Sequence, residues 1–513
     1  MEDDQQLRKW KTRKPCEDEE DRLSQLPCNV LSSIFSHLTA REAVRTSVVS
    51  TKWRYLWTRC LSHITLDVDN MLDQEEFSNP DSLREVEFQK LIVPWKRMLA
   101  FLSAADQFVR GLSPDHKIER FKVYFSFYRN KYGGYLDRWI SFAISRGVEE
   151  LELDLLEVDH YLAVPVRGRI YDFPCDHLIN DGNIRQTNLL GFNTLKILYL
   201  RWVDLRSNDH VSNLLSSCPM LEWLSLHECA GLHCLRIVHP SCARLQYLNV
   251  CQCVGLNAIE VRGINIEKFE YKGCRIDFVF NEVTQLKTVF SHLVQWRMDA
   301  CDVLTIPSLL NSLPHVETWL LFCSFCKKAE LLPHEFPTFS KLKTLSIVEI
   351  ATSQRDLSRL ATFLKAFPSL ERLELHHLFY DDLPRGWVQT SFLSPFYEIK
   401  QLCLCYLSQL HTLHSLEEEG EMKRVAGCPH ERLREVLITG AIGHVHEIEI
   451  AVCLLKNAVL LEKMTIDPRP RYYTGEGEWD VAQARGSWMT HGRKKVVECI
   501  RSEARPRTTL TIL

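Results

Sequence analysis

The residue types that could bind a metal ion or carry redox chemistry are few and scattered along the chain. Cys323 and Cys326 form a Cys-x-x-Cys pair, but no second pair follows at the distance that a zinc finger requires. His444 and His446 stand beside Glu447 without the further ligands that would complete a metal site. We therefore expect buried structural thiols and imidazoles at the surface or in a cap, with no metal and no cofactor.

The motifs of common catalytic and nucleotide-binding sites are absent from the sequence. It contains no G-x-S-x-G nucleophile elbow, no G-x-x-x-x-G-K-[ST] phosphate loop and no H-E-x-x-H zinc motif. Gly475 and Gly477 lack the third glycine of a dinucleotide-binding loop. The sequence gives catalysis no support, so we predict a protein that is not an enzyme and acts by binding.

Composition and charge are typical of a large folded protein of a reducing compartment. The chain has 513 residues, of which 45% are hydrophobic, and a formal net charge of −4 at pH 7. Without a basic excess, nucleic acid is a poor default partner. The cysteine count of 19 is odd, and the sequence has no Asn-x-Ser/Thr pattern, no secretory apolar region and no apolar run of about 18 residues. We expect no membrane span and a location in the nucleus and/or the cytoplasm.

Residues 1–21 are expected to form a disordered, charged tail. A cluster of lysines and arginines precedes an acidic run over residues 17–21, and almost no apolar side chain is available for burial. The basic cluster could be a nuclear address, although a solvated tail is the simpler interpretation.

Three short helices are predicted within residues 22–62. Apolar residues between Val30 and Leu38 recur at the spacing of one helical face. Thr39 stands three residues before Glu42, which is the capping box that begins a second helix. A third helical stripe consists of Trp53, Leu56, Trp57 and Cys60.

This small unit cannot bury all of its apolar surface by itself, so part of that surface is expected to face a partner. The segment DRLSQLPCNVLSSIFSHLTAREAVRTSVVSTKWRYLW resembles an F-box. The resemblance implies docking onto a Skp-type adaptor and, through it, onto a cullin. The residues that we expect to face or support the adaptor are Leu26, Pro27, Ile34, Leu38, Val44 and Trp53.

A pattern of the form L-x-x-L-x-L recurs from residue 63 onward and predicts a solenoid over residues 63–425. Starts at Leu195, Leu221, Leu245 and Ile266 are 26, 24 and 21 residues apart, within the period of leucine-rich repeats. The fits begin at Ile118, Val148, Leu195, Leu221, Leu245, Ile266, Val316, Leu342, Leu370, Ile399, Leu433 and Leu461, with a weaker member at Leu286. Several follow helical stretches that end in Cys-Pro or Phe-Pro, so each repeat is predicted to be helix, turn and strand, with the helices covering the convex side of a curved parallel sheet. Residues 63–115 and 157–190 fit poorly and could be irregular repeats or insertions.

Near the C-terminus, residues 426–470 include HERLREVLITGAIGHVHEIEIAVCLLKNAVLLEKMTIDP, which resembles the FBD segment of plant F-box proteins. The pattern predicts a strand, a glycine-rich turn, a helix and a last strand that cap the solenoid, and residues 471–513 are expected to extend this cap. The expected fold is α/β, with a three-helix F-box, an irregular leucine-rich-repeat solenoid and an FBD cap. The chain as a whole resembles the plant F-box/FBD/leucine-rich-repeat family.

Side chains between the buried leucines are expected to point to the concave face, because side chains alternate along a strand. Their charges are mixed, so neither a basic nor an acidic groove is predicted. Interface hot spots are enriched in Tyr, Trp and Arg, and aromatic residues occur here in successive repeats. The predicted substrate-binding residues are Tyr199, Arg201, Trp223, His227 and Tyr247. We expect Trp223 and Tyr247 to form one aromatic platform flanked by Arg201 and His227; alternatively, these aromatic rings only pack against one another.

The resemblance implies a non-catalytic substrate receptor of a cullin-based SCF-type ubiquitin ligase, which acts by bringing its substrate protein close to the ligase machinery. The alternative is a leucine-rich-repeat binding scaffold that recruits no ligase.

Overall fold

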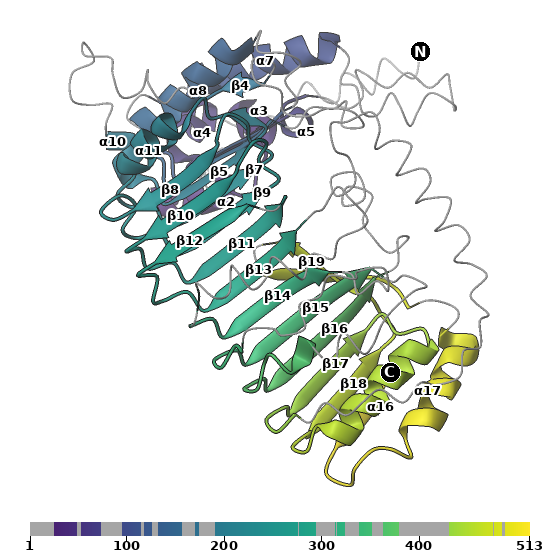
Figure 1. Cartoon of the computed structure of the whole chain (residues 1–513). Helices are drawn as coiled ribbons and strands as arrows, with labels where there is room; N and C mark the ends of the chain where they lie inside the picture. The colour runs from purple at the N-terminus through teal and green to yellow at the C-terminus, as the bar shows by residue number, and fades with distance from the viewer. Residues whose placement is uncertain are drawn as a thin grey trace, which may run out of the picture.

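The structure is a computed structural model in which a long parallel sheet forms the body of the molecule (Figure 1). The residues that it describes are 25–48, 53–72, 95–113, 117–125, 132–155, 170–173, 190–274, 276–293, 313, 315–323, 338–350, 363–378, 430–475, 477–484 and 488–513. In this part of the chain, no helix is both long and apolar enough to cross a membrane.

The main sheet contains fourteen strands of the described residues, which pair in parallel in the order β1-β2-β3-β5-β7-β9-β11-β13-β14-β15-β16-β17-β18-β21. Their bounds are β1 His63–Asp67, β2 Arg120–Tyr124, β3 Glu150–Asp154, β5 Ile197–Arg201, β7 Trp223–His227, β9 Tyr247–Cys251, β11 Lys268–Gly273, β13 Thr288–Leu293, β14 Thr318–Cys323, β15 Thr344–Ile350, β16 Arg372–Leu378, β17 Glu435–Thr439, β18 Lys463–Asp467 and β21 Thr509–Ile512. The predicted repeats each supply one strand, except the one at Ile399, which lies outside the described residues. β1 carries the same pattern at Leu61, Ile64 and Leu66, a match that the repeat prediction missed.

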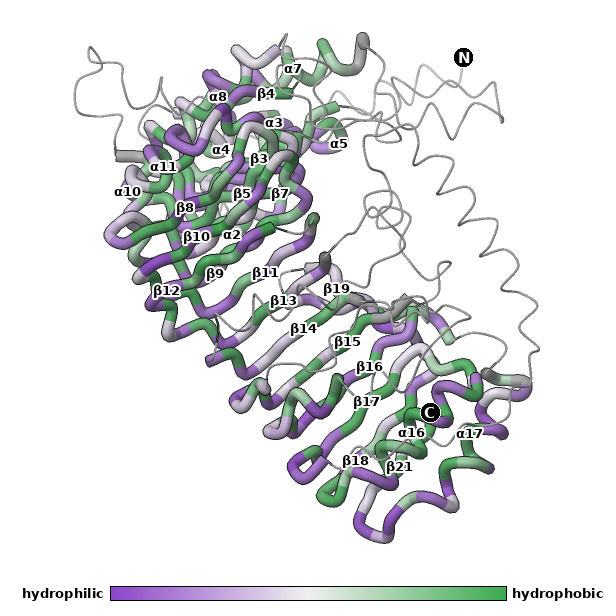
Figure 2. Tube along the Cα trace, in the orientation of Figure 1, coloured by the Kyte–Doolittle hydropathy of each residue, from purple (hydrophilic) through white to green (hydrophobic). Residues whose placement is uncertain are grey.

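The inner side chains of the strands form the core, because equivalent positions of neighbouring repeats are register partners. Leu198, Leu224 and Leu248 lie side by side on β5, β7 and β9 and are at most 1% exposed. Figure 2 shows hydrophobic and hydrophilic residues alternating along these strands. Burial of one such side chain contributes about 1.5–3 kcal/mol, and only the adjacent repeats can provide it.

Helices cover the core side of the sheet towards its two ends (Figure 1). Between β7 and β13 a second, smaller sheet covers it instead. The helices are α7 Trp95–Gly111, α8 Gly133–Ser145, α10 Leu190–Thr194 and α11 Asn208–Ser216 near the first strands, and α16 Val445–Asn457 and α17 Arg493–Ile500 near the last. Short elements complete the fold: α5 Val68–Met71, the paired strands β4 Tyr171–Asp172 and β6 Val203–Asp204, and a π-helical turn, η9, at Trp488–Gly492.

The prediction of a helix in every repeat is wrong between β7 and β13. There, three short parallel strands form a second sheet in the order β12-β10-β8, with bounds β8 Cys234–Val238, β10 Ala258–Arg262 and β12 Asp277–Asn281. Leu235 and Ile237 are fully buried, whereas Arg236 between them and Val238 after them are exposed. This period of two is that of a strand, and the short connections between main strands leave little length for a helix.

Two thiols, one buried and one half-buried, join successive repeats in the same region. Cys229 donates from its Sγ to the carbonyl of Leu200 at 3.4 Å, and Cys253 donates to the carbonyl of Leu226 at 3.5 Å. Each thiol thus satisfies a carbonyl group one repeat away, and cysteine combines this weak donor with apolar packing. These cysteines are structural.

The N-terminal unit contains α2 Cys28–Phe35 and α3 Ala40–Arg45, followed by the 3-10 turns η2 Thr46–Val48 and η3 Trp53–Tyr55 and by α4 Trp57–Cys60. The predicted capping box is confirmed: Glu42 N–H donates to Thr39 Oγ1 at 3.2 Å, and Thr39 N–H donates to Glu42 Oε2 at 2.8 Å. The third predicted helix is instead split into η3 and α4. The split lets Trp53 pack on Phe35, with ring centroids 5.8 Å apart, while Trp57 faces the solenoid.

No linker separates this unit from the solenoid. α4 ends at Cys60 and β1 begins at His63. Trp57 stacks on Phe108 of α7, with ring centroids 5.3 Å apart, and one continuous cluster of buried side chains runs from Leu31 to Ile500. Part of the apolar surface that was expected to face a partner is therefore buried within the chain.

The C-terminal region confirms the predicted strand, turn, helix and strand as β17, α16 and β18. Glu447 closes the turn by accepting hydrogen bonds from the N–H groups of Ile442, Gly443 and His444 at 2.8–3.1 Å. Gly443 adopts a φ of 87°, and a Cβ there would lie 2.4 Å from the Cα of Gly492, so the two backbones meet at glycine.

Residues 471–513, which were predicted to extend the cap, divide into two parts. α17 and β21 do extend it, since β21 adds a strand beyond β18. However, β19 Arg471–Gly475 and β20 Glu478–Val481 form an antiparallel hairpin that packs on the opposite face of the main sheet. No local pattern predicts this position, because the hydrogen bond between Tyr473 and Glu270 joins residues about 200 positions apart in the sequence.

Replacement of Trp57 by Ala should lower the free energy of unfolding by about 3–5 kcal/mol, because it removes a large ring from the joint between the N-terminal unit and the solenoid. Tyr55→Ala is the matched control, since Tyr55 is 64% exposed and should change stability by less than about 0.5 kcal/mol. Urea denaturation followed by circular dichroism measures both. Equal effects of the two substitutions would contradict the shared core.

Candidate functional site

The side of the main sheet whose side chains point away from the leucine core is here called the concave face. Its residues form three rows across the strands, because the strands pair in register. The first row contains Arg120, Glu150, Ile197, Trp223, Tyr247 and Lys268, the middle row Lys122, Glu152, Tyr199, Ser225, Asn249 and Glu270, and the third row Tyr124, Asp154, Arg201, His227, Cys251 and Lys272.

Charged side chains on β2 and β3 neutralise one another. Lys122 Nζ lies 2.7 Å from a carboxylate oxygen of Glu150 and 2.7 Å from one of Glu152. Arg120 Nε lies 2.9 Å from Glu150, and Tyr124 donates to Glu152 at 2.6 Å. The two positive and two negative charges cancel, so this end of the concave face presents a mixed surface, in line with the mixed charges of its sequence.

Trp223 and Tyr247 are register partners, and their ring centroids lie 3.8 Å apart. Trp223 Nε1 donates to Ser225 Oγ at 2.9 Å, which fixes the indole, and Lys268 Nζ lies 4.9 Å from the centroid of the Tyr247 ring. Tyr247 is only 5% exposed, whereas Trp223 is half-buried. The two expected rings are thus adjacent, but Trp223 supplies most of the accessible surface.

Arg201 and His227 do not flank this platform, contrary to expectation. They occupy the third row, four residues further along their strands and so about 13 Å from the first row. Tyr199 stands in the middle row, and its ring lies 4.9 Å from that of His227. The five predicted residues therefore divide into two groups, one of Trp223 with Tyr247 and one of Tyr199, Arg201 and His227.

An ion-pair network organises the second group. Arg201 lies 3.3 Å from Asp154 and 3.0 Å from Glu228, and Trp202 Nε1 donates to Glu228 at 2.6 Å. The Arg201 side chain is only 19% exposed, so two carboxylates stabilise a largely buried cation. Arg201 is consequently engaged within the chain.

The imidazole of His227 is held neutral at physiological pH. Burial, together with the positive charges of Arg201 and Lys272, lowers its pKa to about 3. Burial likewise lowers the pKa of His292, whose ring stacks on Phe322 at 3.9 Å. Neither imidazole is poised near neutrality, as a general acid or base would be.

Three left-handed residues follow the strands of this region and were missed by sequence reasoning. Trp202, Glu228 and Gln252 come directly after β5, β7 and β9 and have φ values of 60°, 50° and 50°. Such angles are uncommon for residues other than glycine and cluster at functional sites. The three residues stand at equivalent positions in consecutive repeats, and this repetition was the signal that could have revealed them. However, Trp, Glu and Gln are not residue types that indicate a left-handed turn.

The predicted adaptor residues differ widely in exposure. Pro27 is exposed and Val44 is 39% exposed, whereas Leu26, Ile34 and Leu38 are half-buried. Trp53 is 6% exposed and packs on Phe35, so it can only support the surface from within. Exposed apolar side chains that were not among the predicted adaptor residues are Val30, Val48 and Tyr55.

Elsewhere the described residues offer little for catalysis. Among them, no group of three or more His, Cys, Asp and Glu residues is placed to hold a metal ion. Burial raises the pKa of Cys242 and of Cys251 to about 12, which keeps both thiols protonated. Cys323 ends β14, and Cys326 lies outside the described residues.

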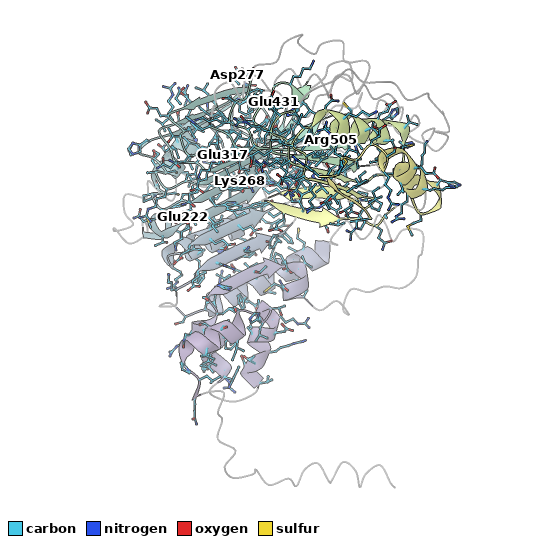
Figure 3. All side chains as sticks on the ribbon, turned by 90° about the horizontal axis from the view of Figure 1, so that it is seen from below. Glu222, Lys268, Asp277, Glu317, Glu431 and Arg505 are labelled. Carbon is cyan, nitrogen blue, oxygen red and sulfur yellow. The ribbon has the colours of Figure 1, made fainter. Side chains whose placement is uncertain are left out.

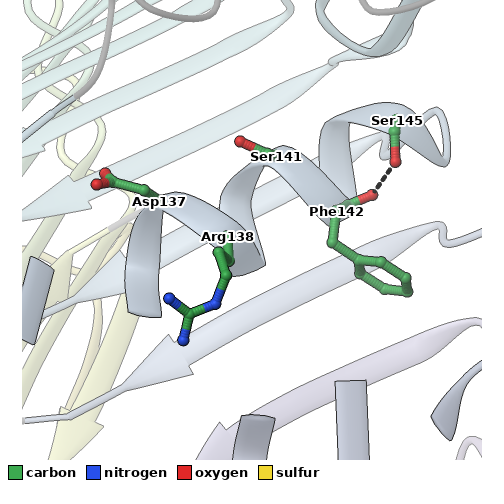
Figure 4. Close-up of a pocket in the computed structure, with 5 residues that line it drawn as sticks. All are labelled: Asp137, Arg138, Ser141, Phe142 and Ser145. Carbon is green, nitrogen blue, oxygen red and sulfur yellow. Dashed lines mark hydrogen bonds between the residues drawn. The ribbon is translucent and has the colours of Figure 1, made fainter. Parts of the chain in front are cut away.

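Figure 4 shows a shallow hollow on α8, away from the concave face. It is lined by Asp137, Arg138, Ser141, Phe142 and Ser145. Ser145 donates to the backbone carbonyl of Phe142 at 2.7 Å, and neither histidine nor cysteine belongs to this set. The hollow contains no nucleophile with an adjacent base.

Profiles of known families match three parts of the chain. The F-box domain profile matches residues 23–65, the profile of the At1g61320/AtMIF1 LRR domain matches residues 115–382, and the FBD profile matches residues 421–466. The second match alone covers just over half of the chain.

Similar proteins occur in Arabidopsis thaliana. The chain is 28% identical over 208 residues to the F-box/FBD/LRR-repeat protein At1g13570, covering 40% of this chain and 44% of that protein. It is 25% identical over 420 residues to the putative F-box protein At1g49610, covering 77% of this chain and 92% of the relative. It is 24% identical over 368 residues to the F-box/LRR-repeat protein At3g03360, covering 69% and 70%. The match thus spans less than half of the first of these relatives.

Acidification from pH 6.5 towards pH 5 should destabilise the protein, and His227→Gln should weaken this pH dependence. His227 binds a proton near pH 6.5 when unfolded but only near pH 3 when folded. Between these values the unfolded state binds more protons, so stability rises with pH, by at most about 1.4 kcal/mol per pH unit for this residue. Urea denaturation at pH 7, 6 and 5 measures the slope, with the exposed His37→Gln as control. An unchanged slope in His227→Gln would contradict a neutral imidazole with a lowered pKa.

Proposed function

Because the chain belongs to the plant F-box/FBD/leucine-rich-repeat family, we propose that it is the substrate-recognition subunit of a cullin-based SCF-type ubiquitin ligase. In this proposal the F-box binds a Skp-type adaptor and, through it, a cullin, while the repeats bind the protein to be ubiquitinated. The observation that carries the proposal is that an F-box with exposed apolar side chains and a repeat array with a partly open concave face share one core.

The exposed apolar residues of the F-box support the adaptor interface. Val48 is 89% exposed, Tyr55 64%, Val44 39% and Val30 38%. Side chains of this kind on one small unit are typical of a surface that another protein covers. Leu26 and Pro27 lie at the entry to α2, where Pro27 is exposed.

The shared core supports a fixed geometry between the two binding surfaces. The stacked rings of Trp57 and Phe108 join the F-box directly to α7, and the Ser113 N–H donates to the carbonyl of Thr58 at 3.0 Å. A substrate on the concave face would therefore be held at a set position relative to the adaptor. In this proposal the chain acts by proximity: it raises the effective concentration of the substrate near the ligase machinery. This action needs no catalytic group on the chain itself.

Trp223 is the proposed anchor for the substrate. It is the accessible member of the stacked aromatic pair, and its indole is oriented by Ser225. Rigid aromatic side chains of this kind often contribute a large share of binding energy.

The proposal places the protein in the nucleus, the cytoplasm or both. Ten of the cysteines that the structure describes are thiols outside any disulfide, and Cys229 and Cys242 are buried in that form. Thiols outside disulfides in this number are typical of a reducing compartment.

A binding scaffold that recruits no ligase is the second candidate. The same concave face would serve it, and the F-box would then hold the adaptor without a cullin. Co-purification of the full chain with adaptor and cullin distinguishes the two: a cullin in the complex favours the ligase subunit, and adaptor alone favours the scaffold.

The double substitution Leu26→Ala and Pro27→Ala should weaken adaptor binding by about tenfold or more, because it removes apolar contacts at the entry to α2. The matched control is Val459→Ala with Leu460→Ala, two exposed apolar residues at the far end of the molecule. Titration of the purified chains with the adaptor measures the affinity, and thermal melting checks the fold. Unchanged adaptor binding by the first variant would count against the assigned interface.

Trp223→Ala should abolish substrate capture and leave adaptor binding unchanged. Substrates are identified as proteins that proximity labelling marks in cells and that accumulate when the proteasome is inhibited. Labelling of these proteins should fall about tenfold or more in the variant. If the variant instead melts several degrees lower and loses adaptor and substrate together, Trp223 is a core residue and the assignment is wrong.

A further inference from the structure

The hairpin of β19 and β20 covers part of the concave face. It lies over the strands from β11 to β16, and in Figure 3 it reaches towards Lys268. It belongs to the C-terminal extension, whereas the strands beneath it belong to the middle of the solenoid. The chain thus places one of its own segments where leucine-rich repeats present their open face.

The surface beneath the hairpin is apolar, unlike the charged surface of β2 and β3. The concave side chains of β13 to β16 that contact it form a cluster separate from the leucine core, and this cluster consists of Phe290, Leu320, Phe322, Val348 and Leu378 with Tyr473 of the hairpin. Tyr472 and Trp479 pack against it. Without the hairpin, these neighbouring apolar side chains would face water, at about 25 cal/mol for each Å² exposed.

A polar contact fixes the position of the hairpin on this surface. Tyr473 donates its hydroxyl to the carboxylate of Glu270 and accepts a hydrogen bond from the Gly477 N–H at 2.6 Å. Lys268 Nζ lies 2.8 Å from the same carboxylate. Glu270 is only 2% exposed, and a buried carboxylate that loses a partner is costly. The hydrogen bond from the Tyr473 hydroxyl to Glu270 therefore favours this one position of the hairpin on the sheet.

A second aromatic contact comes from the other strand of the hairpin, where Trp479 is the register partner of Tyr473. The ring of Trp479 lies 4.5 Å from that of His376 on β16 and 5.3 Å from that of Tyr473. The Phe290 ring lies 4.8 Å from that of Tyr473. The two large rings of the hairpin therefore span the distance from β13 to β16.

An isolated two-stranded hairpin is at best marginally stable in water. The order of residues 471–481 therefore depends on the surface beneath them. We propose that the concave face over β11 to β16 is a binding site for an aromatic β-hairpin, and that the chain fills this site with its own residues 471–481. A protein partner is left with the part of the concave face from β2 to β9, where Trp223 lies.

Binding of the hairpin in trans tests the proposal. The probe is a fluorescent cyclic peptide of residues 470–482, and the receptor is the full chain, either unchanged or with Tyr473→Ala and Trp479→Ala to release its own hairpin. The variant should bind the peptide at least about tenfold more tightly than the unchanged chain, whose site is filled. Equal binding by both chains, or no binding by a variant that retains its circular dichroism spectrum, would overturn the proposal.

A pair of single substitutions supplies the matched control. Tyr473→Phe and Tyr472→Phe each remove one phenolic hydroxyl, but that of Tyr472 bonds to the exposed Asp480 at 2.9 Å, whereas that of Tyr473 bonds to buried Glu270. Tyr473→Phe should speed hydrogen exchange of the backbone amides of residues 471–481 about tenfold or more, and Tyr472→Phe should not. Each of these two variants lacks only one hydroxyl group. They therefore test whether the concave face holds the hairpin even if the double variant fails to fold. Equal exchange in the two would show that the concave face does not hold the hairpin through Glu270.

Discussion

The rest of the structure depends on one constraint, which is that a repeat can bury its inner leucines only against the repeats beside it. Leu198, Leu224 and Leu248 illustrate this, since each is buried between register partners of neighbouring strands. A strand that slipped by one residue would move every inner side chain to the other face. The in-register sheet, the continuous core and the direct joint at Trp57 all follow from this requirement.

The same register decides what the concave face can offer. It aligns Trp223 with Tyr247 in one row, and it keeps Arg201 and His227 about 13 Å away along their strands. Because the strands are parallel and regular, residues at equivalent repeat positions meet, while residues in the first and third rows of one strand lie apart. The concave face is consequently a set of separate surfaces: a charged one on β2 and β3, an aromatic one at Trp223, and an apolar one beneath the hairpin.

Two of the buried charged groups on this face are matched by partners of opposite or complementary polarity. Arg201 is placed between two carboxylates, and Glu270 receives both Lys268 and Tyr473. Such pairing is what a low-dielectric environment requires of a charge. The face is therefore largely organised before any partner arrives, which limits the ordering that binding must impose.

The sequence by itself determined the repeats, the first two F-box helices and the strand, turn and helix of the FBD segment, because each rests on a local period of apolar residues. It also determined that Trp223 and Tyr247 would be neighbours, since both stand at the same repeat position. Only the tertiary structure decided that Tyr247 is buried, that three central repeats carry strands in place of helices, and that residues 471–481 lie on the concave face. The reason is physical: the hydrogen bond from Tyr473 to Glu270 joins residues about 200 positions apart, and no local pattern records which distant surface a hairpin will find.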